Sequence, residues 1–186
     1  GFMYRAGDGA EIQEAYRAMQ KASRIPMLLP CNLESGGNGL TTNGTFFGKE
    51  LAIAATNDPE HAYRFGLVCG REGGSVGCNW TFSPIVDLDL NWRNPITNVR
   101  TFGSDTDTVI AMAREFLRGI RDAGFPMATC IKHFPGDGVD ERDQHLLSTV
   151  NSLSVEEWEQ TYGRIYRTLI DEGAETVMVG HILQPA

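Results

Sequence analysis

The segment "MATCIKHFPGDGVDERDQH", residues 127–145, passes directly from an apolar run into a turn-rich stretch dense in titratable groups. The apolar run has the length of a short buried strand. From Ile131 to His145 the segment holds three aspartates, two histidines, a lysine and two glycines. In parallel α/β folds, functional groups lie where strands end. The segment is therefore either an ordinary solvated loop or part of an active site.

Outward from this segment, apolar runs of strand length alternate with segments of helical periodicity. The pattern predicts strands at residues 25–33, 76–88, 126–134 and 174–182. It predicts helices at residues 10–23, 57–74, 104–124 and 154–173. The last helix opens with a capping box, Ser154 with Glu157 three residues later. Repeated βαβ units of this kind imply a parallel sheet.

Polar residues follow several different strands, which favours a (β/α)8 barrel over a doubly wound sheet. In a barrel all strand ends share one catalytic face, whereas a doubly wound sheet concentrates its site at one switch point. The polar residues at strand ends are Asn32, Glu34, Asp87, Asp89, Lys132, His133 and His181. The glycine-rich stretches 34–39 and 71–77 do not fit a phosphate-binding loop, so no nucleotide cofactor is predicted.

The length of the chain predicts an incomplete barrel. A full (β/α)8 barrel needs about 250 residues, and this chain has 186. It supplies four predicted strands, five at most, and no low-complexity linker divides it. We expect a single domain over residues 1–186, an α/β fold forming a partial TIM-type barrel. The open edge of such a barrel predicts association with another chain or segment.

Composition excludes several other classes of protein. The net charge of −8 argues against binding to nucleic acid or to an anionic membrane. No run approaches the roughly 18 apolar residues of a membrane span. Four cysteines without CxxC spacing are interpreted as reduced thiols and not as a zinc site. With no signal-peptide pattern at the start, these features predict a cytoplasmic location.

Asp143 and His145 form a D-x-H pattern in the loop. On an extended segment, side chains at i and i+2 point to the same face, so the carboxylate would hold one ring nitrogen and leave the other for a substrate. Such an oriented imidazole is suited to proton transfer. The alternatives are a chance polar loop or a metal site. No helix-borne HxxxH pair or carboxylate ladder supports a metal, and none is predicted.

The run "KHFPGDGVDERDQH", residues 132–145, resembles the signature of family 3 glycoside hydrolases, in the β-N-acetylhexosaminidase branch. The family pattern K-H-F-[PG]-G-x-G-x(4)-D-x-H is matched at each defined position. Further similar stretches follow in the family's order, and the resemblance runs from about Ile25 to Ile182. They are "NLESGG" at 32–37, "NWTFSPIVDLDLN" at 79–91, "NVRTFGSDTDTV" at 98–109 and "ETVMVGHI" at 175–182.

The resemblance implies a retaining, exo-acting β-N-acetylglucosaminidase. Its substrate would carry a terminal β-linked N-acetylhexosamine on a peptidoglycan- or chitin-type fragment, as in peptidoglycan recycling. His145 would act as general acid and then as general base, oriented by Asp143. Residues implied to bind substrate or line its pocket are Lys132, His133, Arg100, His181, Asn32 and Asp87.

The chain departs from the family pattern in three places. Asp137 stands where the family usually has histidine, a change we expect to alter the charge of the loop without touching the dyad. Asn32 and Ser35 replace the usual aspartate and glycine. No S-D-D-like nucleophile motif follows His181, which predicts that the chain is inactive alone. The alternatives are another family 3 glycosidase of β-glucosidase type and a non-catalytic carbohydrate-binding remnant.

Overall fold

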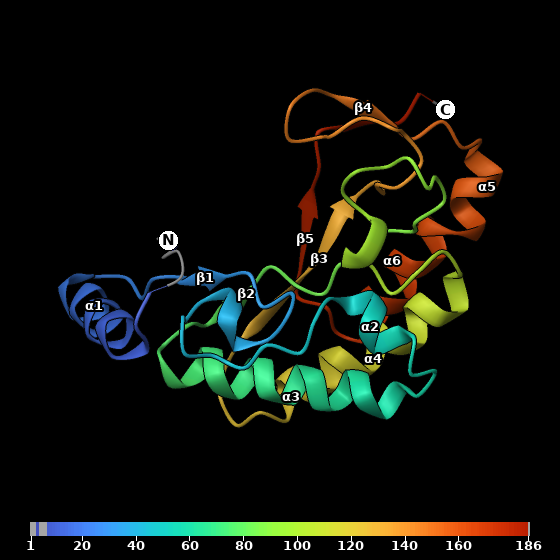
Figure 1. The fold of residues 1–186 in the computed structure, drawn as a ribbon. Helices are drawn as coiled ribbons and strands as arrows, with labels where there is room; N and C mark the ends of the chain where they lie inside the picture. Colours follow the sequence, from blue (N-terminus) through green and yellow to red (C-terminus); the bar gives the residue numbers. More distant parts are fainter. Residues whose placement is uncertain (1–2, 4–6, 186) are drawn as a thin grey trace.

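The computed structural model describes residues 3 and 7–185, and its centre is a four-stranded parallel sheet (Figure 1). The strands, in spatial order, are β1 (Pro30–Cys31), β2 (Trp80–Thr81), β3 (Ala128–Phe134) and β5 (Thr176–Val179). All neighbours in this sheet are parallel, and the order follows the chain. A doubly wound sheet would instead reverse its order at a switch point. The predicted α/β partial barrel is confirmed.

The strands are shorter than predicted at 25–33 and 76–88. In the second of these runs the regular strand ends at Thr81. Beyond it, Phe82 N still donates to Cys31 O at 2.8 Å and Val86 N to Lys132 O at 2.9 Å. Pro84 interrupts the run and has no N–H to donate to a ladder. The sheet therefore extends past β2 as scattered backbone bonds and not as a regular strand.

A second, unpredicted parallel ladder joins β4 (Thr149–Val150) to β6 (Ile182–Leu183). In Figure 1 this ladder lies beyond the carboxyl ends of β3 and β5. The side of β5 away from β3 has no strand partner among the described residues, and Val179 is 71% exposed there. The structure thus has an open sheet edge, and association through it stays a prediction.

The main helices include three that begin at the capping residues that the sequence predicts. They are α1 (Gly9–Ala22), α3 (Pro59–Ser75), α4 (Thr106–Arg121), α5 (Val155–Gln160) and α6 (Tyr162–Asp171). The side chains of Asp58, Asp105 and Ser154 cap α3, α4 and α5, and the Ser154–Glu157 capping box is present. Short elements that were not predicted are α2 (Glu50–Ala54) and the 3₁₀ turns η1 (Gly37–Gly39) and η2 (Asn98–Arg100).

The prediction of one continuous helix over 154–173 is wrong, because the chain breaks at Thr161. Thr161 has φ −113° and ψ −95°, and its hydroxyl donates to Glu157 O at 2.7 Å. Trp158 in α5 donates its ring N–H to Pro135 O at 2.7 Å, in the loop after β3. This bond connects α5 to the loop, whereas α6 packs its apolar face into the core.

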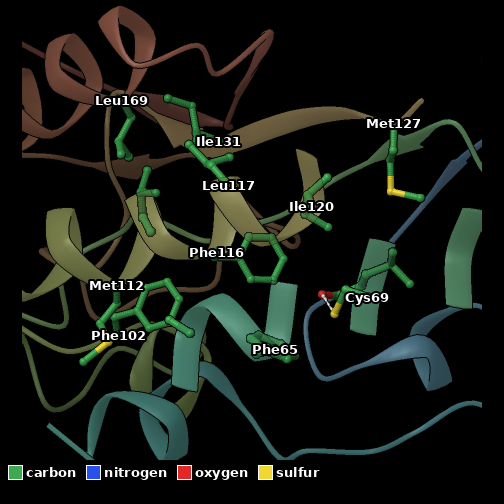
Figure 2. Close-up of a cluster of buried hydrophobic side chains, with 14 of the residues drawn as sticks. Phe65, Cys69, Phe102, Met112, Phe116, Leu117, Ile120, Met127, Ile131 and Leu169 are labelled. Carbon is green, nitrogen blue, oxygen red and sulfur yellow. Dashed lines mark hydrogen bonds between the residues drawn. The ribbon is translucent and has the colours of Figure 1, made fainter. Parts of the chain in front are cut away.

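The core lies between the sheet and α3, α4 and α6. A Cβ added to Gly66 would lie 2.2 Å from Phe116 O, and one added to Gly119 would lie 2.1 Å from Tyr63 O, so these glycines let α3 and α4 approach closely. Figure 2 shows Phe65 and Phe116, whose ring centroids are 5.1 Å apart, in the same cluster as Ile131 of β3. This packing fixes β3 and leaves its carboxyl end free to carry functional groups. No helix in the described part of the chain is long and apolar enough to span a membrane.

Candidate active site

A cleft of about 260 Å³ opens at the carboxyl ends of the sheet strands. It brings together most of the residues predicted from the sequence. Those lining it are Asn32, Arg100, Lys132, His133, His145 and His181. The other two predicted residues, Asp87 and Asp143, lie behind the lining and hydrogen-bond two of its histidines.

Glu34 organises the cations on one side of the cleft. Lys132 Nζ lies 2.6 Å from Glu34 Oε1, and the Arg100 guanidinium donates to both carboxylate oxygens at 3.0 to 3.3 Å. Burial raises the pKa of Glu34, but the charges of Lys132 and Arg100 outweigh burial and lower the pKa to about 2. Glu34 was noted after a strand but not predicted as a site residue. Lys132 at the end of an apolar strand could have identified it, because a buried lysine needs a carboxylate partner.

Asn32 completes this cluster, because its Oδ1 accepts a hydrogen bond of 3.4 Å from Lys132 Nζ. The Lys132 side chain is 4% exposed, so its charge is held almost entirely by protein groups. Asn32, Glu34 and Lys132 therefore form a polar wall whose hydrogen bonds are already in place.

His133 is held by Asp87 in the interior of the site. Its Nδ1 lies 2.7 Å from Asp87 Oδ2, and its backbone N–H donates to Asp87 Oδ1 at 3.1 Å. The His133 side chain is 8% exposed and the Asp87 side chain 1%. Asp87 is therefore a supporting residue that fixes the ring of His133, whose exposed edge faces the cleft.

Asp143 and His145 form the pair predicted from the D-x-H pattern, but by a different backbone geometry. The segment is a turn and not an extended strand. Asp143 Oδ1 accepts the His145 backbone N–H at 2.8 Å and contacts His145 Nδ1 at 2.7 Å. This backbone bond, together with the ring, lowers the pKa of Asp143. The side chain of His145 is 56% exposed and lines the cleft.

His181 lies in the segment between β5 and β6 and is exposed, with its backbone N–H donating to Gln144 Oε1 at 3.2 Å. Gln144 is buried, although it stands between the half-buried Asp143 and the exposed His145. Its position makes it part of the site, and no sequence pattern singled it out.

Asp137 is more closely connected to the dyad than the sequence led us to expect. Its Oδ2 accepts a hydrogen bond of 2.6 Å from Gln144 Nε2, inside the D-x-H triplet. Burial, followed by the nearby Asp87 carboxylate, raises the pKa of Asp137. Among the described residues, the Asp137 side chain makes no hydrogen bond to Asp143 or His145 themselves, as expected, but it is bonded to Gln144, the residue that lies between them.

Taken together, the cleft offers an exposed imidazole with a carboxylate behind it, next to a wall of buried, charge-compensated donors. The first is suited to moving a proton, and the second to binding hydroxyl groups. Among the described residues, no three His, Cys, Asp or Glu side chains gather as a metal ion would require.

The sequence profile of the glycosyl hydrolase family 3 N-terminal domain matches residues 4–186. The chain belongs to glycosyl hydrolase family 3. A β-N-acetylglucosaminidase/β-glucosidase from Cellulomonas fimi is 48% identical over 186 residues, which are 100% of this chain and 33% of that protein. A β-hexosaminidase from Neisseria meningitidis serogroup C is 30% identical over 178 residues, 89% of this chain and 47% of that protein.

Solved structures of the family share the fold. A β-glucoside phosphorylase, BglX, is 53% identical with a TM-score of 0.95, over 98% of this chain and 33% of that one. A family 3 β-N-acetylglucosaminidase from Paenibacillus sp. is 29% identical with a TM-score of 0.90, over 99% of this chain and 36% of that one. The chain thus spans between a third and a half of the length of these curated relatives.

Proposed function

We propose that this family 3 chain carries the acid–base and sugar-binding part of a retaining, exo-acting β-N-acetylglucosaminidase. The substrate would present a terminal β-linked N-acetylhexosamine on a peptidoglycan- or chitin-type fragment. The observation that carries the proposal is the Asp143–His145 contact of 2.7 Å, whose imidazole lines a cleft together with the hydrogen-bond donors of Lys132 and Arg100. The names of the Cellulomonas fimi and Neisseria meningitidis relatives support the same class of activity.

In this mechanism His145 moves the proton. Asp143, kept ionised by its lowered pKa, holds Nδ1–H and so presents Nε2 to the substrate. The protonated imidazole donates from Nε2 to the departing glycosidic oxygen. The neutral imidazole then accepts a proton from the water that releases the sugar. A histidine here takes the part that a carboxylic acid plays in most glycosidases.

In the subsite before the scissile bond, the sugar would accept hydrogen bonds from Lys132, Arg100 and His133. Glu34 compensates the two cations, so the wall can donate to neutral hydroxyls without a large excess of charge. The nucleophilic carboxylate of the retaining mechanism is assigned, on the family resemblance, to a segment after His181. For that reason we expect the full-length polypeptide to be active and this segment alone to be inactive.

The experiment compares hydrolysis of two 4-nitrophenyl substrates by the full-length polypeptide. We expect 4-nitrophenol release from the β-N-acetylglucosaminide to be far faster than from the β-glucoside. Equal rates on both sugars would remove the N-acetylhexosamine assignment and leave a family 3 glycosidase of broader specificity. Sugar binding without release from either substrate would favour the carbohydrate-binding alternative.

A second candidate, phosphorolysis of a β-glycoside, is favoured by the 53% identity to a structure named as a β-glucoside phosphorylase. In that reaction inorganic phosphate replaces water as the acceptor, and the product is a sugar 1-phosphate. The two candidates separate when the same assay is run with and without phosphate and the sugar product is identified. A rate that rises with phosphate, with sugar 1-phosphate as product, would establish the second reaction.

The cytoplasmic location and the role in peptidoglycan recycling stay predictions. Cys31, Cys69, Cys78 and Cys130 are free and buried, which agrees with the interpretation as reduced thiols. Fractionation of the native cells, with the protein detected by antibody, would locate it.

A further inference from the structure

The loop that carries the dyad, residues 141–148, has one buried side chain, that of Gln144, while its pairing of Glu141 with Arg93 is exposed. Of residues 141–148, Gln144 is buried, whereas the others are exposed or half-exposed, including Leu146 at 79%. The bonds that Asp143 makes to His145 and to the next backbone N–H groups lie within the turn. They shape the turn but do not fix its position relative to the sheet.

Gln144 makes bonds to two separate segments. Its Nε2 donates to Asp137 Oδ2 at 2.6 Å, in the loop directly after β3. Its Oε1 accepts the backbone N–H of His181 at 3.2 Å, just after β5. Both ends of the amide are therefore used, and they connect the dyad turn to the carboxyl ends of two neighbouring strands.

Asp137 is itself firmly anchored. Its Oδ1 accepts from Asn94 Nδ2 at 2.9 Å and from the Gly138 backbone N–H at 2.7 Å. Its own backbone N–H donates to Asp87 Oδ1 at 2.8 Å, the carboxylate that also holds His133. A displacement of Gln144 is thus resisted by groups that belong to the fixed floor of the site.

We propose that Asp137 and Gln144 form a buried latch that positions the turn carrying His145 over the cleft. We assign both as positioning residues that act through the placement of the imidazole, although Gln144 also lines the cleft. The inference rests on the proposed function and adds to it the device that sets the distance between His145 and the sugar-binding wall.

The hydrogen-bond chemistry of the latch allows a reciprocal test. In Asp137→Asn, the new amide N–H₂ group faces the N–H₂ group of Gln144, and if Gln144 flips, its donor meets the His181 backbone N–H instead. In Gln144→Glu, two carboxylates face each other. In the double variant Asp137→Asn/Gln144→Glu, the asparagine donates to the new carboxylate, whose other oxygen still accepts from His181. The donors and acceptors then match again.

The kinetic experiment measures kcat and KM of the full-length polypeptide on β-glycosides with poor and with activated leaving groups. We expect each single variant to lose about 10- to 100-fold in kcat on poor leaving groups, because misplacement of about 1 Å is that costly. The loss on 4-nitrophenyl substrates is smaller, since they need less proton donation. We expect the kcat of the double variant on poor leaving groups to lie within about threefold of that of the unmodified protein.

Hydrogen–deuterium exchange of peptides covering residues 141–148 supplies a readout that does not depend on activity. We expect faster exchange in each single variant and restored protection in the double variant. Glu141→Gln is the matched control, because its pairing with Arg93 is exposed and lies outside the latch. It should leave the exchange of residues 143–148 unchanged.

The latch is wrong if exchange is unaltered in the single variants, or if the double variant is no better protected than either. Equal kinetic losses on both leaving groups, accompanied by a lower midpoint of thermal unfolding, would also overturn it in favour of a purely structural role. If the unmodified polypeptide cleaves no β-glycoside, the proposed function fails, and exchange alone then decides whether the latch exists.

Discussion

Two histidine–aspartate pairs in the site share one hydrogen-bond pattern but differ in their surroundings. In each, the carboxylate accepts both the ring Nδ1 and the backbone N–H of the same histidine, with Nδ1 at 2.7 Å. The His133–Asp87 side chains are 8% and 1% exposed, whereas the His145–Asp143 side chains are 56% and 25% exposed. Asp87 is 46 residues from its partner and Asp143 only two.

The difference in surroundings gives the pairs different consequences. The long-range pair forms only when β3 and the segment after β2 are in place, so it is part of the fold. The local pair is made within one turn and is reached by solvent, and the proposed function assigns proton transfer to its imidazole. An exposed pair contributes little to stability, while breaking a buried one is costly.

The largest expected effect is on turnover, and it separates the two histidines. His145→Ala in the full-length polypeptide should lower kcat on poor leaving groups by about 10²- to 10⁴-fold, the usual contribution of general acid–base catalysis. The loss should be smaller on activated 4-nitrophenyl substrates. Steady-state kinetics on both classes checks it.

His133→Ala is the matched control for this comparison. We expect it to act mainly through KM and through stability, with similar losses on both classes of leaving group. If His133→Ala instead shows the stronger dependence on the leaving group, the assignment of roles to the two pairs is reversed.

The next effect is on stability, and it separates the two aspartates. Asp87→Ala should lower the free energy of unfolding by about 3 kcal/mol, because it leaves the His133 ring, the His133 N–H and the Asp137 N–H without their buried acceptor. Asp143→Ala should cost less than about 1 kcal/mol. Urea unfolding followed by circular dichroism measures both, and similar losses would erase the distinction.

The architecture could be predicted because its signals are local. Apolar runs alternating with capped amphipathic helices indicated parallel βαβ units, and the side chains of Asp58, Asp105 and Ser154 cap as expected. The features of the fold that were not predicted depend on tertiary contacts. The break at Thr161 lies next to a long-range bond from Trp158 to Pro135, and the β4–β6 ladder pairs segments that carry no strong strand pattern.

The site was predictable where a motif fixes neighbouring residues and not where separate loops meet. The spacing of Asp143 and His145 sufficed to pair them, although through a turn instead of a strand. The burial of Gln144 and its bond to Asp137 depend on how two loops fold against each other. Glu34 lay between these cases, since a strand-end carboxylate was visible but its cationic partners come from distant segments.

Glu34 extends the comparison to a buried carboxylate paired with Arg100 and Lys132. Its folded pKa of about 2 is below the ordinary value of 4.5, so its stabilisation is complete above about pH 4.5 and is lost as the pH falls toward 2. The difference in pKa corresponds to ~3 kcal/mol at most. Between pH 5 and 2, Glu34→Gln should therefore lose less unfolding free energy than the unmodified protein. Parallel acid dependences in the two proteins would show that the cations do not hold Glu34 ionised.

The smallest effect concerns Glu50, a fully buried carboxyl group that forms no ion pair with any residue the structure describes. Its Oε1 accepts the Ile85 N–H at 3.1 Å, while Oε2 has no hydrogen-bond partner within residues 3 and 7–185. Burial raises its pKa well above the ordinary 4.5, the opposite of Glu34. For a carboxyl group whose folded pKa is raised, the free energy of unfolding decreases as the pH rises above the unfolded pKa.

Glu50→Gln keeps the acceptor for the Ile85 N–H and places an uncharged N–H₂ group where the acid proton would sit. The variant should therefore be as stable as the unmodified protein at pH 4 and more stable at pH 8. Midpoints of thermal unfolding at the two pH values measure this. A variant that is less stable than the unmodified protein at pH 8 would mean that the Glu50 carboxylate is ionised and stabilised in the fold. Glu50 would then behave like the paired carboxylates of Asp87 and Glu34.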